Sequence, residues 1–336
     1  MINLDIKQKT IAKEVTLSGV GLHTGKSVTM TFKPAPENSG YSFVRIDLEG
    51  RPIIEADANY VVTTQRGTNL EKNGVNINTS EHVLAALVGL EIDNCIIELN
   101  ASEPPIMDGS SKYFIEILET AGFIEQEAFV EEYIVKEIIS YKDEKTGSEI
   151  MIMPSDKYEL TTMVDFGTNV LGTQNASITK ISEFKKEISD SRTFSFLHEI
   201  EMLLDHGLIK GGDLNNAIVY VDKELSPDIM DKLRVAFGKD DIAVKPNGIL
   251  NNLTLNHPNE AARHKLLDVI GDLALIGTSD VHDLIDWDYK PHEGGHRPVT
   301  LVFAKEKTAD SIKEGLLAKR TVVWFKNMLN EIGQTI

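Results

Sequence analysis

The order of the expected elements predicts an α+β fold built from two similar units. In each half of the 336-residue chain, a region of predicted strands precedes predicted helices. This order, found twice, is typical of the α+β class. The boundary is placed in the acidic stretch 125–132, which predicts domains at 1–127 and 128–336. The expected strand regions are 9–50, 94–99, 133–141, 149–154 and 158–165, and the expected helices are 81–87, 111–121, 196–205 and 264–273.

A sequence pattern that occurs at two predicted helix starts supports the prediction of two similar units. The segments Glu81–Gly89 and Arg263–Gly271 each have a histidine at the second position, apolar residues at matching later positions and a glycine at the ninth. Apolar residues at helical spacing predict a helix with one buried face. Two like helices that each start with a histidine would face each other across a shared site.

The histidines of this pattern form a candidate metal site. His82 and His264 would meet between the two units, and Asp268 lies one helical turn beyond His264, on the same face. Two imidazoles and one carboxylate suit catalytic zinc and leave a fourth position open for water. The spacing of His264 and Asp268 is a weak signal by itself, because most such pairs are solvated or cap a helix. The repeated context strengthens it.

Three charged neighbours of these residues each have two interpretations. Glu81 could take a proton from a metal-bound water, or it could be an acid that the dipole favours at a helix N-terminus. Lys265 could contact an anionic substrate group or be a surface lysine. Asp272, one turn beyond Asp268, could orient a histidine or support a metal ligand from outside. The residues alone leave these alternatives open.

The composition narrows the class of protein. With 52 acidic against 34 basic residues, the chain is a poor partner for nucleic acid, although a phosphate-bearing small molecule needs only one or two cations. The single cysteine, Cys95, excludes an internal disulfide and fits a reducing compartment. The start of the chain has no signal-peptide pattern, and the apolar stretch 266–277 is too short to span a bilayer. A cytoplasmic protein is expected, without a transmembrane segment.

Several short motifs occur in the order in which one enzyme family has them, over about residues 8–277. They are Gly19-Val20-Gly21-Leu22-His23-Thr24-Gly25, Ser80-Glu81-His82, Ile92-Asp93-Asn94, Pro105-Ile106-Met107-Asp108-Gly109, Ser191-Arg192-Thr193-Phe194, Gly207 to Gly212, and Arg263 to Asp272. In these motifs the chain resembles the UDP-3-O-acyl-N-acetylglucosamine deacetylases, zinc enzymes of lipid A biosynthesis in Gram-negative bacteria. The resemblance implies two β-α-α domains that form a sandwich, with the active site between their helix layers.

The resemblance also assigns roles to residues. It implies Zn²⁺ as the cofactor, with His82, His264 and Asp268 as its ligands and Glu81 as the general base. Thr193 would stabilise the oxyanion by donating a hydrogen bond, and Phe194 and Lys265 would contact the substrate. The partner would be a UDP-linked acylated amino sugar, which permits transient contact with a membrane surface. The region 196–212, otherwise an ordinary amphipathic helix packed on the core, would receive the acyl chain.

The tail from residue 278 departs from this family pattern. The family has a general acid histidine there, held by the aspartate at the position of Asp272; His296 could fill that place, although Val299 stands where an asparagine is usual. The tail instead resembles the end of a polymerase-and-histidinol-phosphatase-type phosphoesterase, whose ligands would be Asp280 and His282. A chimera with a junction near Gly277 is therefore expected, and its last segment, 320–336, is predicted to be an amphipathic helix.

Two other functions stay open at this stage. The first is a metallophosphoesterase that uses Asp280 and His282. The second is a catalytically impaired chimera that binds zinc and a UDP-lipid without turnover. The preferred hypothesis is zinc-dependent hydrolysis of the N-acetyl group, which releases acetate.

Overall fold

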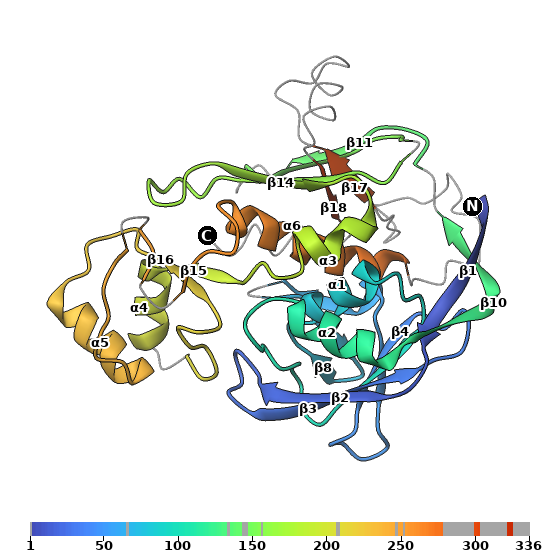
Figure 1. The fold of residues 1–336 in the computed structure, drawn as a ribbon, viewed down its shortest axis with the longest axis horizontal. Helices are drawn as coiled ribbons and strands as arrows, with labels where there is room; N and C mark the ends of the chain where they lie inside the picture. The colour runs from blue at the N-terminus through green and yellow to red at the C-terminus, as the bar shows by residue number, and fades with distance from the viewer. Residues whose placement is uncertain are drawn as a thin grey trace.

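The computed structural model describes residues 2–64, 67–132, 135–142, 147–155, 157–205, 209–245, 248–250, 253–277, 299–302 and 321–324. It is a mixed α+β structure in which helices lie between sheets (Figure 1). The expected α+β class is therefore confirmed. Within the described residues, no helix is long and apolar enough to cross a membrane.

A five-stranded sheet forms the base of the N-terminal part, with the order β2-β3-β9-β4-β5. In β3, every second residue is buried, as the alternation of apolar and polar residues requires for a sheet with one covered face. On the open face, hydroxyl pairs such as Thr16 with Thr31 cross between neighbouring strands. The strands are β2 (Val15–Val20), β3 (Ser27–Pro34), β4 (Tyr41–Arg45), β5 (Ile53–Glu55) and β9 (Cys95–Leu99).

Two smaller strand groups extend this part. A long antiparallel pair, β1 with β10, runs along the right side of Figure 1. The expected boundary between residues 127 and 128 falls inside β10, so the acidic stretch is a paired strand. A three-stranded sheet follows a short 3-10 helix, η1 (Ala58–Tyr60). The strands are β1 (Ile2–Ile11), β10 (Phe123–Glu132), β6 (Val61–Thr63), β7 (Asn69–Lys72) and β8 (Val75–Ile77).

The second sheet has the order β14-β13-β18-β17 and packs against a long helix, α6. Strand β18 pairs with both β13 and β17, so parts of the tail are built into this sheet. The expected helix over 320–336 is wrong at its start, because 321–324 pair as a strand; the rest of that segment lies outside the described residues. The elements are β13 (Leu160–Val164), β14 (Gln174–Ile178), β17 (Val299–Val302), β18 (Thr321–Trp324), the β11–β12 hairpin (Ile139–Lys142, Glu149–Ile152), η2 (Ile181–Glu183), α3 (Phe184–Glu187) and α6 (Glu260–Gly277).

A separate lobe stands to the left of the two sheets in Figure 1. It contains the parallel pair β15 (Phe194–Phe196) and β16 (Ile218–Tyr220), with α4 (Leu197–Asp205) and α5 (Pro227–Phe237). Leu197 and Ile200 of α4 are buried in a small apolar core that this lobe forms with its own residues. The helix expected over 196–205 is confirmed, and its apolar face is packed.

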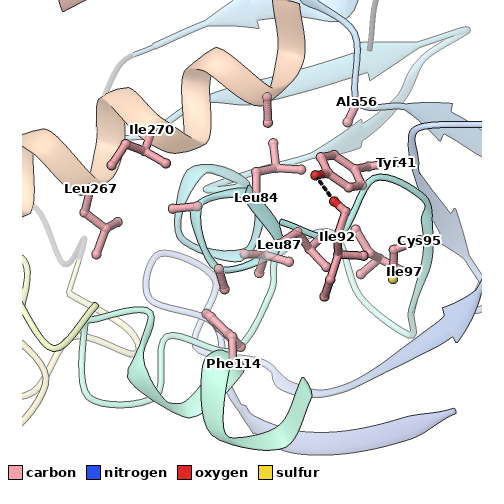
Figure 2. Packing of buried hydrophobic residues seen from close by; sticks show 14 of the residues in the cluster. Tyr41, Ala56, Leu84, Leu87, Ile92, Cys95, Ile97, Phe114, Leu267 and Ile270 are labelled. Carbon is pink, nitrogen blue, oxygen red and sulfur yellow. Dashed lines mark hydrogen bonds between the residues drawn. The ribbon is translucent and has the colours of Figure 1, made fainter. Parts of the chain in front are cut away.

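One apolar core joins the two sheets. Helices α1 (Glu81–Gly89) and α2 (Lys112–Ala121) lie over the first sheet, and α1 contacts α6, which in turn contacts β13 and β14. Figure 2 shows Leu84 and Leu87 of α1 between Phe114 of α2 and Leu267 and Ile270 of α6. The Tyr41 hydroxyl donates to the Ile92 carbonyl at the edge of this cluster (Figure 2).

The starts of α1 and α6 differ, and the start of α6 corrects one expectation. Ser80 precedes α1, but its hydroxyl donates to the Thr68 carbonyl at 3.0 Å instead of capping the helix. Helix α6 begins at Glu260, one turn before His264, so the second histidine lies inside its helix and does not start it. The repeated sequence pattern therefore marks two contacting helices whose histidines occupy different positions.

Candidate metal centre and active site

His82, His264 and Asp268 come together where α1 meets α6. One ligand atom from each residue can be chosen so that all three lie within 4.8 Å of one another. Asp268 Oδ1 lies 3.6 Å from His82 Nε2 and 3.4 Å from His264 Nε2. The two imidazole rings meet edge to face, with 5.0 Å between their centroids. Both helices therefore present nitrogen and oxygen ligands to one point.

The close contact of the helices depends on a glycine. A Cβ added at Gly271 would lie 2.0 Å from the Glu81 carbonyl oxygen. No side chain fits there, so the backbones of α1 and α6 approach each other directly. Gly271, one turn beyond Leu267, therefore fixes the separation across which His82 and Asp268 face each other.

Both histidines have the protonation state that a metal ligand needs. Burial lowers the pKa of His82 to about 3, with His264 adding to the effect, and burial also lowers the pKa of His264. His264 Nδ1 lies 3.1 Å from the Ser191 carbonyl oxygen, to which its N–H can donate a hydrogen bond. That contact leaves Nε2 unprotonated and directed at Asp268, which is the usual arrangement of a histidine ligand.

Asp268 gives an independent indication that this site fits a cation. Its Oδ2 accepts a hydrogen bond from Lys265 Nζ at 2.8 Å, whereas its buried Oδ1 has no hydrogen-bond partner among the described residues. A buried carboxylate oxygen without a partner is costly. Two neutral imidazoles and one carboxylate oxygen fit Zn²⁺, which takes nitrogen and oxygen ligands and keeps an open position in catalytic sites.

Glu81 and Asp272 are linked through Thr68. The Thr68 backbone N–H donates to Glu81 Oε2 at 2.8 Å, and its hydroxyl donates to Asp272 Oδ1 at 2.6 Å. Burial raises the pKa of Glu81 to about 8, with the charges of Asp268 and Asp272 acting in the same direction. Burial raises the pKa of Asp272 to about 7, against the opposing effect of the Thr68 hydrogen bond. Carboxyl groups with a pKa near neutrality suit proton transfer.

Thr193 and Phe194 lie on the segment that enters β15. The Thr193 N–H donates to the Gly109 carbonyl at 2.7 Å, and its carbonyl accepts from Ile218 N at 2.9 Å. The Phe194 ring meets the His264 ring edge to face at 6.2 Å, and Lys265 Nζ lies 5.6 Å from the centre of the Phe194 ring. Phe194 also contacts Phe166, Phe196 and Tyr220, which form an aromatic wall beside the metal site.

The glycine-rich loop 19–25 contacts both the N-terminal part, through Glu103, and the segment around Gly211. Buried Glu103 accepts hydrogen bonds from the backbone N–H groups of His23 and Thr24 at 3.0 and 2.9 Å. Gly211 N donates to the Leu22 carbonyl at 3.0 Å, and a Cβ at Gly211 would lie 2.0 Å from the Gly21 oxygen. The loop is thus held by Glu103 on one side and packs on the lobe at the other.

The structure places seven of the expected site residues around this point: His82, His264, Asp268, Glu81, Asp272, Phe194 and Lys265. Thr193 is fixed on the adjoining segment. His296, Asp280 and His282 lie outside the described residues. Sequence reasoning missed Thr68 and Glu103, since nothing in their local pattern distinguishes them from other polar residues.

A two-histidine, one-aspartate cluster beside a buried glutamate is the kind of centre that metal-dependent hydrolases use. The family model described as UDP-3-O-acyl N-acetylglycosamine deacetylase matches residues 8–236 and 228–304. The chain belongs to this family.

Named relatives agree with the family match. The bifunctional enzyme LpxC/FabZ of Bacteroides thetaiotaomicron is 49% identical over 272 residues, which cover 81% of this chain and 59% of that protein. A UDP-3-O-acyl-N-acetylglucosamine deacetylase of Saccharophagus degradans is 39% identical over 295 residues, 87% of each chain. One from Myxococcus xanthus is 40% identical over 272 residues, 80% of this chain and 78% of the relative. The aligned part thus spans about three fifths of the bifunctional relatives.

The family match also corrects the expected junction near Gly277. It runs to residue 304 and includes His296, so family resemblance continues into the tail. Strands β17 and β18 lie in the same sheet as β13 and β14, which also argues for a continuous domain. The resemblance of the tail to a phosphoesterase has no support in these comparisons.

Proposed function

We propose that this chain hydrolyses the N-acetyl group of a UDP-3-O-(3-hydroxyacyl)-N-acetylglucosamine and releases acetate, as a step of lipid A biosynthesis. The observation that supports this most directly is Asp268 Oδ1, which has no hydrogen-bond partner in the described part of the chain and faces two neutral histidines beside Glu81. The names of the deacetylase relatives supply the substrate. We assign the metal to Zn²⁺ and its ligands to His82, His264 and Asp268.

Zinc at this position would polarise the acetamide carbonyl and lower the pKa of a water molecule. Glu81, buried and held by the Thr68 N–H, takes the proton from the attacking water. The water oxygen forms a bond with the carbonyl carbon, and the Thr193 hydroxyl donates a hydrogen bond to the oxygen that becomes negative. The carbon–nitrogen bond then breaks, and the amine leaves with a proton.

Asp272 and His296 are the groups that we assign to protonation of the leaving amine. Asp272 would orient His296, and the Thr68 hydroxyl donates a hydrogen bond to the aspartate. Phe194 and Lys265 would contact the sugar nucleotide, since an aromatic face and an ammonium group lie together there. The products are acetate and a free 2-amino sugar that remains linked to UDP.

The same proposal assigns the larger units. The two sheets with their helices would be two β-α-α domains, 1–127 and 128–336, with the active site between the helix layers. The lobe with α4 and α5 would receive the acyl chain, close to the aromatic wall around Phe194. We place the reaction in the cytoplasm, with transient contact at a membrane surface.

A deacetylation assay with metal analysis tests this proposal. Wild-type protein loaded with zinc should release acetate. The Glu81→Gln variant should still bind zinc, but its turnover should fall about 10²–10⁴-fold. The His264→Ala variant should lose both zinc binding and turnover. Lys72→Ala, which removes a surface ion pair with Glu55, is the control and should not change turnover.

Undiminished turnover in Glu81→Gln or His264→Ala would contradict the mechanism. Phosphate release that survives His82→Ala and disappears in His282→Ala would point to a phosphoesterase in the tail. Zinc and substrate binding without acetate release would identify an inactive binding protein.

A further inference from the structure

We propose that Arg192 and Glu260 form a positioning pair that holds Thr193 against the α6 face carrying His264 and Asp268. Neither residue touches the reacting atoms; they act through the segment 190–193. This inference rests on the proposed deacetylase function and adds to it two residues on which the oxyanion donor depends.

Glu260 collects hydrogen bonds from two separate segments. Arg192 Nε donates to Glu260 Oε1 at 2.8 Å and Arg192 Nη2 donates to Oε2 at 3.1 Å. The backbone N–H of Arg192 donates to Oε1 at 3.1 Å, and that of Asn256 donates to Oε2 at 2.6 Å. Each carboxylate oxygen therefore accepts two hydrogen bonds, and Glu260 is fully buried at 0% exposure.

The Arg192 guanidinium has a second partner besides Glu260. Its Nη2 also donates to the Thr254 carbonyl at 2.6 Å, and the residue is 7% exposed. Two forked contacts and one backbone carbonyl leave the guanidinium a single orientation, because its donors are arranged in a rigid plane. The Arg192 backbone is tied to the same carboxylate, so its chain position is fixed together with its side chain.

The Arg192–Glu260 pair lies between the segment that carries Thr193 and the part of α6 that carries His264 and Asp268. Glu260 comes one helical turn before His264, which comes one turn before Asp268, so α6 carries all three on one face. Arg192 is flanked by Ser191, whose carbonyl lies 3.1 Å from His264 Nδ1, and by Thr193. The ion pair thus sets the distance between the Thr193 segment and the helix that carries the metal ligands.

Stability alone is a weak explanation for such a pair. Buried ion pairs are often no more stabilising than apolar residues of the same volume. Arg45 and Asp47 offer a comparison, because they form a forked pair at 2.8 and 2.7 Å, and Arg45 donates to the Asn76 carbonyl at 2.9 Å. That pair joins the end of β4 in the first sheet to β8 of the three-stranded sheet, away from α6, so it serves as a matched control.

The test is a double-mutant cycle between Glu260→Gln and Thr193→Val, measured as kcat, KM, zinc content and thermal midpoint. Glu260→Gln should lower kcat about 10–100-fold, as loss of a group that supports a functional residue does, while KM and zinc content change by less than about threefold. In the Thr193→Val background, Glu260→Gln should lower kcat by less than about threefold, because the hydroxyl that the pair positions is gone. Asp47→Asn should lower the thermal midpoint and leave kcat unchanged.

The Arg192→Met/Glu260→Leu double variant keeps the test valid if Glu260→Gln does not fold, since it leaves no unpaired buried charge. It should fold, bind zinc and show the same loss of kcat. An unchanged kcat, or a loss that adds fully to that of Thr193→Val, would overturn the inference while wild-type acetate release leaves the proposed function intact. Absence of acetate release from the zinc-loaded wild type would overturn both.

Discussion

Helices α1 and α6 have the same sequence pattern but supply the site in different ways. Helix α1 is nine residues long and provides Glu81 and His82 from its first turn, with eight of its residues buried. Helix α6 is 18 residues long and provides Glu260, His264, Asp268 and Asp272 from one face at intervals of four. A short helix contributes its end, and a long helix contributes a face. The shared sequence pattern therefore marks where the two helices contact each other, and its residues do not occupy equivalent positions along the two helices.

The two helices are also held by different chemistry. Around α1, neutral hydroxyl groups make the contacts: Ser111 Oγ donates to the His82 carbonyl at 2.7 Å, and Ser80 Oγ donates to the Thr68 carbonyl. Helix α6 is held at its start by the buried charges of Glu260 and Arg192. Forked hydrogen bonds between a guanidinium and a carboxylate require a more specific geometry than single hydrogen bonds from hydroxyl groups. We therefore expect the α6 side to govern alignment of the site and the α1 side to tolerate more change.

The largest expected effect tests the contact between the helices. Gly271→Ala places a Cβ 2.0 Å from the Glu81 carbonyl oxygen, so the helices must separate. The free energy of unfolding should fall by about 3 kcal/mol or more, and the affinity for zinc should fall with it. Urea unfolding and metal titration measure both. Gly212→Ala, whose Cβ would meet atoms no closer than 3.6 Å, is the matched control; equal behaviour of the two variants would contradict the close approach.

A smaller effect is expected at the link between Glu81 and Asp272. Thr68→Val removes the hydroxyl that donates to Asp272 Oδ1 but keeps the backbone N–H that donates to Glu81. The lost contact to a buried carboxylate should cost about 1–3 kcal/mol of unfolding free energy and lower turnover roughly tenfold. Thr120→Val, at an exposed hydroxyl on α2, should change stability by less than about 0.5 kcal/mol. A Thr68→Val protein with full turnover would show that the two carboxyl groups act independently.

The smallest effect concerns Cys95, which reports on the core that both helices share. Burial raises the pKa of this thiol to about 12, so folded protein should resist iodoacetamide at pH 8 and react fully in urea. Mass spectrometry of the alkylated protein measures the rate. The rate should rise in Gly271→Ala, because Cys95 belongs to the same apolar cluster as Leu267 and Ile270 of α6. Rapid labelling of the folded wild type would contradict this prediction, because the core would then open even without a substitution in α6.

Local pattern was sufficient for much of the fold. The helices expected at 81–87, 111–121 and 196–205 correspond to α1, α2 and α4, and the strand at 94–99 corresponds to β9. Helix α2 is the clearest case, because its apolar residues follow helical spacing and it ends before Gly122, whose φ of 68° suits glycine. The start of α6 was missed because residues 260–263 contain no apolar residue larger than alanine.

The site was predictable only as far as spacing and family motifs reach. His264 and Asp268 lie one turn apart on a helix, so sequence could pair them. The partners of these residues come from distant segments: Thr68 is 204 residues from Asp272, and Arg192 is 68 residues from Glu260. Such contacts arise from packing of the two sheets and leave no local signal.

The position of β18 has a consequence for synthesis of the chain. Residues 321–324 occupy an interior place in a sheet, where Thr321 pairs with Thr161 of β13, a strand made much earlier. Strand pairings across such long separations form slowly, because a long loop must close first. Until residues 321–324 have been made, β13 lacks the partner that β18 supplies on that edge. The nascent second half therefore depends on β18 to cover a sheet edge that would otherwise be available to other chains.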